Sequence, residues 1–464
     1  MHSSLRLTAL ALALALAGCA AVGPTYQRPA VDTPVAFKEG QGAWVPATPA
    51  DTLERGPWWQ LFGDPVLNGL AERVAVDNQN VAQAVAAYAQ SRALVAEQRA
   101  SLFPRVGLDL GASRRGGGGG TASSSSEQIG IGGSWELDVW GRLGRAVDAA
   151  RSGELASASD LAAARLSAQG ELAANYFALR GLDVQRSLLD ETITGYQRNL
   201  QITQNRYTAG IVARTDVLQA QTALANAQAD ALTLERQRAQ LEHAIAVLVG
   251  VAPASFALAA EPTWLINLAP VLVTVPSTLL HRRPDIAAAE RRVAAANEQI
   301  GIAQAAYYPS LSLSGSVGLG AATIGELFSA SSLVWSLGVS VAQTLFNAGA
   351  TGARVDQARA SHEAATARYR QAVLNAFVQV ENQLVASRVL GQQLALRQQA
   401  SQAATLVEQQ VLNRYTAGQV SYSEVIAAQA TALNARRALV QLQSDRQTAA
   451  VALIQALGGG WAGI

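Results

Sequence analysis

Few residues of this chain are spaced for chemistry, and Cys19 is the first of them. It is the single cysteine among 464 residues, and it follows an apolar run over 7–18 that ends in Leu16-Ala17-Gly18. With about 12 residues this run is too short to cross a bilayer, which takes about 20. Small residues before a cysteine are typical of a bacterial lipoprotein signal. We therefore predict a signal peptide and an acylated N-terminal Cys19.

The neighbours of Cys19 indicate where the chain resides. Ala20 replaces the aspartate that tends to retain such lipoproteins in the inner membrane, so we expect an outer membrane protein anchored by lipid on Cys19. A buried free cysteine behind an ordinary signal peptide is the alternative. A single cysteine allows no disulfide framework and no cysteine metal site. The four histidines are isolated in sequence, so we predict neither a metal site nor a cofactor.

Two carboxylates, Glu136 and Asp138, lie two residues apart and therefore on one face of a predicted strand. Paired carboxylates could serve acid–base hydrolysis. No grouping of nucleophile, base and oxyanion donors accompanies them, so we interpret them as charges that face a watery lumen. The formal net charge of +1 gives no electrostatic footprint for nucleic acid. We therefore predict neither an enzyme nor a nucleic-acid-binding protein.

The sequence is internally duplicated. The pentapeptide RYTAG occurs at 206–210 and again at 414–418, and the upstream segments VDAAR and VDQAR recur at the same interval. A unit of roughly 200 residues is far longer than the periods of solenoids or propellers. We predict two tandem repeats behind an N-terminal segment, with these bounds: signal peptide 1–18, lipid-anchored extended segment 19–62, first repeat 63–262 and second repeat 263–464.

Each repeat contains two segments in which apolar and polar residues alternate. In 129–139 isoleucine, tryptophan, leucine and valine alternate mainly with glycine and serine, and 311–319 and 333–341 follow the same rule. About ten alternating residues fit a transmembrane barrel strand with an apolar lipid face and a polar lumen face. A soluble sheet with one wet face is the alternative. The small polar residues favour the membrane, as do aromatic residues that flank the strand ends: Phe103, Trp140, Tyr307, Tyr308 and Phe346.

Long helical segments surround these strands. A helix over about 68–102 should end before Pro104, which helices do not accept. The absence of proline from Arg142 to Thr208 allows a helix of roughly 67 residues, about 100 Å long. A shorter helix should follow over about 215–250. Apolar residues along the long helix form a seam typical of a coiled coil: Leu182, Leu189, Ile193, Tyr196, Leu200 and Tyr207.

The RYTAG turns join the long helices to the shorter ones. Gly210 and Gly418 supply the left-handed residue that ends a helix. Asp216 and Glu424 lie in the first turn of the following helices, where the helix dipole favours negative charge, and Ser421 has capping-box spacing to Glu424. Capping and a role in gating are compatible for both acids.

The number of strands implies assembly. Four strands cannot close a barrel, and lipid does not tolerate an open sheet edge. We therefore predict that two, three or four protomers associate.

Four motifs run through the mature length: CAAVGPTYQRP, PWWQLFGDPVL, the segment from RRPDI to YYPSLSL, and the paired RYTAG turns. With them the chain resembles the TolC-type outer membrane factors, in the lipidated subgroup that serves resistance-nodulation-division efflux pumps. The resemblance implies an α+β membrane protein. It implies a homotrimer with one twelve-stranded β-barrel, four strands from each protomer, and a long coiled-coil α-helical barrel in the periplasm.

The resemblance also implies partners and an aperture. A periplasmic adaptor (membrane fusion) protein and an inner-membrane resistance-nodulation-division pump would open a closed periplasmic end. In relatives a tyrosine of the turn, nearby acids and basic residues hold this end shut. The candidates here are Asp216, Tyr207, Tyr415 and Glu424. The basic residue expected after Gly418 is replaced by Gln419 and Val420.

These observations predict an outer membrane exit duct of a tripartite efflux pump that passively conducts small molecules from the periplasm to the exterior. Two alternatives stay open at this point. One is the exit duct of a protein or peptide secretion system. The other is a structural periplasmic coiled-coil lipoprotein without a pore.

Overall fold

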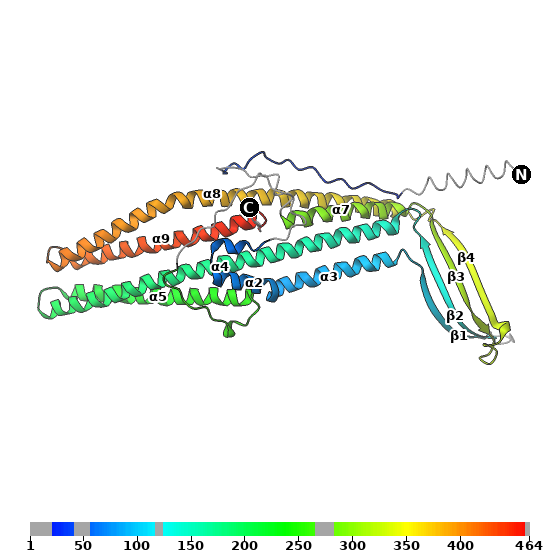
Figure 1. The fold of residues 1–464 in the computed structure, drawn as a ribbon, viewed down its shortest axis with the longest axis horizontal. Coiled ribbons are helices and arrows are strands. Elements are labelled where there is room, and N and C mark those ends of the chain that lie inside the picture. Colours follow the sequence, from blue (N-terminus) through cyan, green and yellow to red (C-terminus); the bar gives the residue numbers. More distant parts are fainter. Residues whose placement is uncertain (1–20, 41–55, 117–123, 265–282, 460–464) are drawn as a thin grey trace. The chain divides into compact units, whose positions relative to one another are not determined.

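The computed structural model describes residues 21–40, 56–116, 124–264 and 283–459. Long helices and one four-stranded sheet make up this part of the chain (Figure 1). By its contacts the chain divides into unit 1, with residues 1–31, 87–158 and 288–371, and unit 2, with residues 32–86, 159–287 and 372–464. Among the described helices, none combines the length and the apolar character needed to cross a bilayer.

The two halves of the chain share one order of elements. The first half holds α2 (Pro65–Asp77), α3 (Gln79–Ala100), β1 (Arg105–Arg115), β2 (Ser124–Leu137), α4 (Arg142–Thr208) and α5 (Arg214–Leu248). The second holds α7 (Pro284–Ala305), β3 (Ser310–Ala321), β4 (Leu333–Ala342), α8 (Ala350–Thr416) and α9 (Tyr422–Ala456). Short 3₁₀ turns are η1 (Trp58–Phe62), η2 (Pro253–Ser255) and η3 (Ala330–Ser332). Both α4 and α8 have 67 residues and both α5 and α9 have 35, which confirms the tandem structural repeat.

The predicted first helix is in fact two helices, α2 and α3, separated at Asn78. This residue has extended dihedrals (φ −68°, ψ 125°), and its side-chain oxygen accepts hydrogen bonds from the amides of Asn80 and Val81. Its side-chain amide donates to the Leu248 carbonyl at the end of α5, over 2.8 Å. The buried Asn78 side chain caps the start of α3 and also bonds the last turn of α5. These bonds interrupt the helix that the sequence pattern predicts as continuous.

Unit 1 contains the sheet, whose antiparallel strands lie in the order β1-β2-β3-β4 (Figure 1). The register of the strands places small polar residues and glycines together on one face of the sheet. Asp109, Gly130 and Gly318 lie opposite one another, as do Gly107, Gly132 and Ser316. The other face carries exposed apolar side chains, among them Leu108, Ile131, Val317 and Trp335. Both β1 and β4 have one unpaired edge within the described chain.

The predicted aromatic residues lie where helices meet strands in unit 1. The rings of Trp140 and Tyr308 stack with centroids 4.8 Å apart, and the Trp140 indole donates to the Pro309 carbonyl over 2.7 Å. Phe103 and Phe346 are largely exposed. An indole or phenol ring beside an exposed apolar strand face is typical of a bilayer interface.

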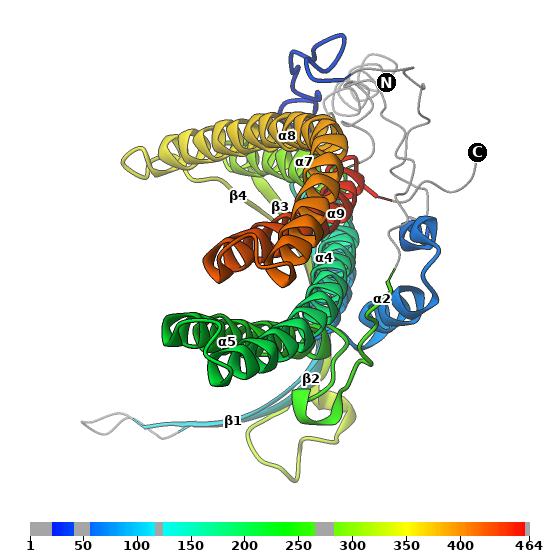
Figure 2. The same cartoon turned by 90° about the vertical axis from the view of Figure 1, so that its left-hand side faces the viewer.

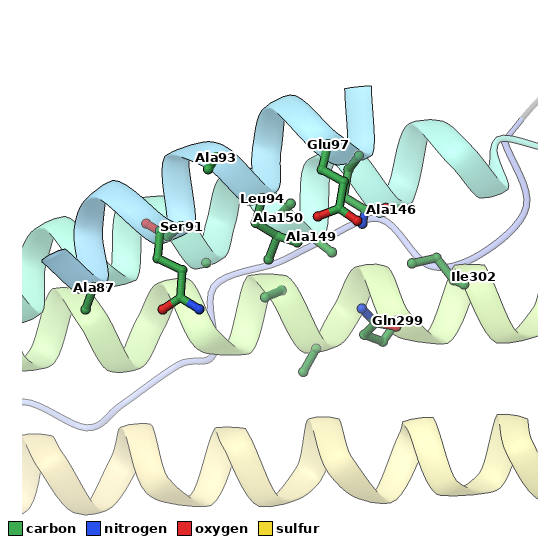
Figure 3. A pocket seen from close by; sticks show the side chains of 15 residues that line it. Ala87, Ser91, Ala93, Leu94, Glu97, Ala146, Ala149, Ala150, Gln299 and Ile302 are labelled. Atoms are coloured by element: carbon green, nitrogen blue, oxygen red, sulfur yellow. The ribbon is translucent and has the colours of Figure 1, made fainter. Parts of the chain in front are cut away.

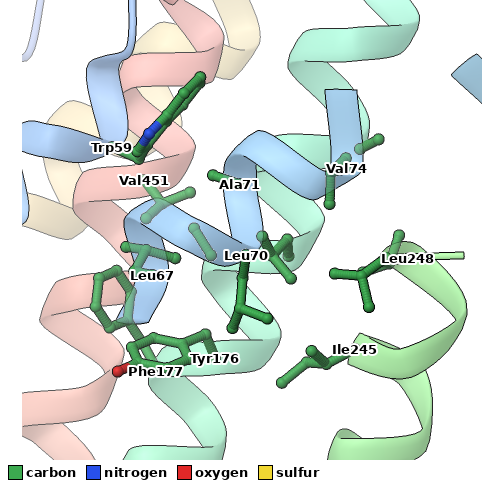
Figure 4. Packing of buried hydrophobic residues seen from close by; sticks show 14 of the residues in the cluster. Trp59, Leu67, Leu70, Ala71, Val74, Tyr176, Phe177, Ile245, Leu248 and Val451 are labelled. Carbon is green, nitrogen blue, oxygen red and sulfur yellow. The ribbon is translucent and has the colours of Figure 1, made fainter. Parts of the chain in front are cut away.

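Unit 2 contains an extensive hydrophobic core. Side chains from η1, α2, α4, α5 and α9 meet around Tyr176 and Phe177, both nearly inaccessible to solvent (Figure 4). Phe62 and Phe177 have ring centroids 4.9 Å apart. Each large side chain buried here contributes about 1.5–3 kcal/mol through removal of apolar surface from water.

A buried ion network lies beside this core. Asp183, with 1% of its side chain exposed, accepts from Arg180 over 3.0 Å and from Arg238 over 2.7 Å. The same arginines donate to the carbonyls of Ala259 and Leu258, which follow α5. The network therefore ties the segment between the repeats to α4 and α5.

Two helical hairpins, α4–α5 and α8–α9, pack against each other in unit 2, and Figure 2 views them from their turns. The predicted seam is confirmed from Leu182 to Leu200, because these residues lie in clusters with α5, α8 and α9. Tyr207 is an exception, with 45% of its surface exposed.

Candidate functional site

The two turns at the hairpin ends have the predicted geometry. Gly210 and Gly418 adopt φ of 72° and 73°, in the left-handed region that glycine tolerates. The amide of Gly210 bonds the Tyr207 carbonyl and that of Ile211 bonds the Arg206 carbonyl, each over 2.9 Å. This pair of bonds is the Schellman arrangement that satisfies the last carbonyls of a helix. The second turn repeats both bonds.

A cluster of three side chains connects one turn to the other. The guanidinium of Arg206 lies 4.7 Å from the ring centroid of Tyr415 and donates to the Tyr415 carbonyl over 3.2 Å. The rings of Tyr415 and Tyr422 have centroids 5.3 Å apart. We call Arg206, Tyr415 and Tyr422 the tip cluster. It holds the end of α4 against the end of α8 by a cation–π contact, and the end of α8 against the start of α9 by ring packing.

The tip cluster is mostly closed to solvent. Tyr415 is 4% exposed and Tyr422 2%. Burial, and then the neighbouring Tyr415, raise the pKa of the Tyr422 phenol to about 12, with Asp216 a smaller contribution in the same direction. The Tyr415 hydroxyl is buried and has no hydrogen-bond partner within the described chain.

The remaining aperture candidates have other surroundings. Glu424 caps α9, because the Ser421 amide donates to its carboxylate over 3.4 Å, and the predicted capping box is confirmed. Asp216 lies in the first turn of α5, half-buried. Tyr207 is 45% exposed whereas Tyr415 is 4% exposed, so the two copies of RYTAG are not equivalent.

Of the two predicted strand charges, Asp138 requires a correction. β2 ends at Leu137, so Asp138 is not a strand residue. Its carboxylate accepts from the amides of Leu143 and Gly144, over 2.9 and 2.6 Å, and so caps the start of α4. Glu136 is in the strand but forms a salt bridge of 2.7 Å with Arg142. Both acids therefore fix the passage from β2 to α4.

Cys19 lies outside the described residues, but the segment that follows it is held closely. In unit 1 the Val22 amide donates to the Trp140 carbonyl over 3.0 Å, and Tyr26 hydrogen-bonds Glu290. In unit 2 Phe37 is buried against Val380. Described residues 21–40 contain neither helix nor strand, and residues 58–62 form the turn η1.

Unit 1 also contains a groove of about 870 Å³ between α3, α4 and α7 (Figure 3). Its floor on α4 consists of alanines and Gly153, and its walls carry Gln90, Gln98 and Gln299. Glu97 is the charged residue of the lining, so the groove brings together no acid–base pair. Nor does any group of three potential metal ligands occur in the residues that the structure describes.

Comparison with known proteins gives these features a context. The sequence pattern of the outer membrane efflux protein family matches residues 70–251 and 275–459, one stretch in each half. The chain belongs to the outer membrane efflux protein family.

Relatives match this family member from end to end. The toluene efflux pump outer membrane protein TtgC of Pseudomonas putida is 31% identical and the match covers 97% of this chain and 94% of TtgC. The cation efflux system protein CusC of Escherichia coli is 29% identical over 99% of both chains. Among solved structures, CusC superposes with a TM-score of 0.85 at 27% identity, and the open MtrE channel of Neisseria gonorrhoeae with 0.85 at 28%; each covers 95% of this chain and at least 98% of the other.

The family fold accounts for the sheet. Each protomer of this trimeric channel contributes four strands to a twelve-stranded barrel in the outer membrane, and the helices form a periplasmic barrel. The unpaired edges of β1 and β4 are satisfied in this way. The family consists of channels, and this member is the outer membrane exit of an efflux system.

Arg206 and Tyr422 were not predicted from the sequence. A basic partner of Tyr415 was expected after Gly418, but the structure supplies it from the other turn. A signal was available, because RYTAG places an arginine beside each tyrosine. Nothing in two identical pentapeptides indicates which arginine meets which ring.

Proposed function

We propose that the chain is the lipid-anchored, homotrimeric exit duct of a tripartite pump. A periplasmic adaptor protein docks on its helical part, and an inner-membrane pump of the resistance-nodulation-division class supplies the energy. The duct itself moves solutes passively. Within this proposal residues 1–18 are removed, Cys19 carries the lipid, 19–62 is the anchored segment, and 63–262 and 263–464 are the repeats.

The two-faced sheet is the observation that carries the proposal. One face presents leucine, isoleucine, valine and tryptophan, and the other glycine and serine, in register over all four strands. An apolar face suits lipid and a small polar face suits a water-filled pore. A spacer without a pore would need neither a lipid face nor a smooth lumen.

The lumen face supports small solutes of mixed chemistry. Hydroxyl pairs such as Ser316–Ser336, 2.8 Å apart, and backbone exposed at glycines offer weak contacts to a passing solute. The names of relatives refer to cations, pyoverdine and toluene. We propose that selection of the solute occurs in the pump and that the duct accepts what the pump delivers.

The aperture candidates act through the tip cluster in this proposal. Arg206 and Tyr415 keep the two hairpins together, and Asp216, Tyr207 and Glu424 line the surroundings of the same end. Binding of the adaptor would separate the hairpins. The charged and aromatic residues would then move apart without unfolding of the helices.

Deletion and complementation test the proposal. Removal of the gene should raise intracellular accumulation of at least one toxic small compound, and wild-type protein should restore export. Cys19→Ser should lose the acyl mass from the N-terminal peptide in mass spectrometry. Unchanged accumulation of every compound tested, with the partner pump shown to be active, would refute the duct.

A further inference from the structure

The lumen face of the sheet carries one carboxylate whose environment differs from that of Glu136. Asp109 lies in the middle of β1, is exposed, and has no ion pair or hydrogen bond from its side chain within the described chain. From the sequence, lumen charge was expected at Glu136 and Asp138, which the structure uses in a salt bridge and a helix cap. Asp109 is therefore free to act on solutes.

The residues beside Asp109 leave it room. Across the sheet its register partners are Gly130 and Gly318, neither of which has a side chain. One carboxylate oxygen lies 3.6 Å from the place that a Cβ on Gly132 would occupy. The carboxylate thus has only glycine backbone beside it at Gly130, Gly132 and Gly318, which leaves space for a hydrated cation to approach it.

Other charges on the same face lie far away along β1. Arg105 is four residues before Asp109 and Arg115 six residues after it. At about 3.3 Å per residue, the Cα atoms of these arginines lie about 13 and 20 Å from the Cα atom of Asp109 along the strand. Both distances exceed the Debye length of about 8 Å at physiological ionic strength, so neither arginine cancels the carboxylate.

We infer that Asp109 forms a ring of three carboxylates in the barrel lumen that makes the outer part of the duct favour cations. The inference rests on the proposed function, because it requires the polar face to line a pore. Threefold symmetry places the three copies at one depth. Neighbouring copies are four strands apart, about 19 Å along the wall, so their mutual repulsion is largely screened.

Ion selectivity in planar bilayers tests the ring. Wild-type channels in a potassium chloride gradient should pass potassium in preference to chloride, and Asp109→Asn should lower this permeability ratio at least about twofold at 0.1 M salt. Asp109→Arg should bring the ratio below one. Glu127→Gln is the matched control, because it removes the same charge from β2 on the opposite face, and its ratio should equal that of the wild type.

Two outcomes distinguish the ring from the duct. If wild-type channels conduct, and intact Asp109→Asn trimers have the same potassium-to-chloride permeability ratio, the ring is overturned. The proposed duct is unaffected by that result. No conductance from wild-type trimers overturns the duct. Salt adds a test without variants, because the Debye length grows to about 30 Å at 0.01 M. A wild-type ratio that does not rise from 0.1 M to 0.01 M also overturns the ring.

Discussion

Replacement of Arg206 by glutamine should loosen the contact between the two hairpin turns. The variant removes the guanidinium that lies 4.7 Å from the Tyr415 ring centroid and donates to the Tyr415 carbonyl. Glutamine keeps helix propensity and a polar tip, so α4 itself should be unaffected. The expected change is therefore a shift in how often the hairpins separate.

The structure sets the size of this shift. A cation–π contact contributes about 0.5–1 kcal/mol when exposed and about 2 when desolvated, and Arg206 is half-buried. The 3.2 Å hydrogen bond is long, so we assign it about 0.5–1 kcal/mol. The sum is about 1–3 kcal/mol for each protomer. The equilibrium between packed and separated hairpins should then move about 5- to 150-fold towards separation.

Single-channel recording measures this shift. Arg206→Gln should show a higher open probability or conductance than the wild type in planar bilayers. Arg414→Gln is the matched control, since Arg414 occupies the same place in the other pentapeptide, is exposed, and has no side-chain partner among the described residues. Equal recordings from Arg206→Gln and Arg414→Gln would refute the reasoning.

Three further predictions concern stability. Gly318→Ala should reduce the yield of heat-resistant trimer, because its Cβ would lie 2.5 Å from the Ile129 carbonyl oxygen, whereas Gly107→Ala, with open space, should not. Asp183→Ala should cost about 3–5 kcal/mol of folding free energy, since it leaves Arg180 and Arg238 without their buried anion; the exposed Asp148→Ala should be nearly neutral in the same thermal melts. Because the pKa of Tyr422 rises from 10 to about 12 on folding, its contribution is full below pH 10 and is lost as pH rises through about 12. Tyr422→Phe should therefore lose less stability than the wild type in an alkaline titration followed by circular dichroism. If the difference in stability between wild type and variant stayed the same from pH 9 to pH 12, the prediction would be contradicted.

Local patterns in the sequence were sufficient for most of the fold. The long helix was predicted from Arg142 to Thr208 and has these bounds, because an uninterrupted stretch without proline permits only one outcome once its seam is packed. Strand alternation predicted the two faces of the sheet because side-chain direction in a strand depends only on position parity. Gly210 and Gly418 were predicted as helix stops for a similarly local reason.

The misses share a physical cause. Asn78 breaks a helical pattern because it bonds a carbonyl 170 residues away, at Leu248. Asp138 leaves the strand because two amides of α4 need an acceptor. In both cases a polar side chain hydrogen-bonds a backbone group, and the local sequence does not reveal where that group lies.

The sequence by itself determined the repeat, the length of the long helix α4, the strand faces and the family, since all of these depend on residue type and short-range spacing. The tertiary structure decided which of two identical pentapeptides contributes its arginine and which its buried tyrosine. It also decided which lumen-side acid has no partner. The physical reason is that pairing between charges and rings depends on distances across helices and strands, and such distances exist only after the hairpins and the sheet have packed.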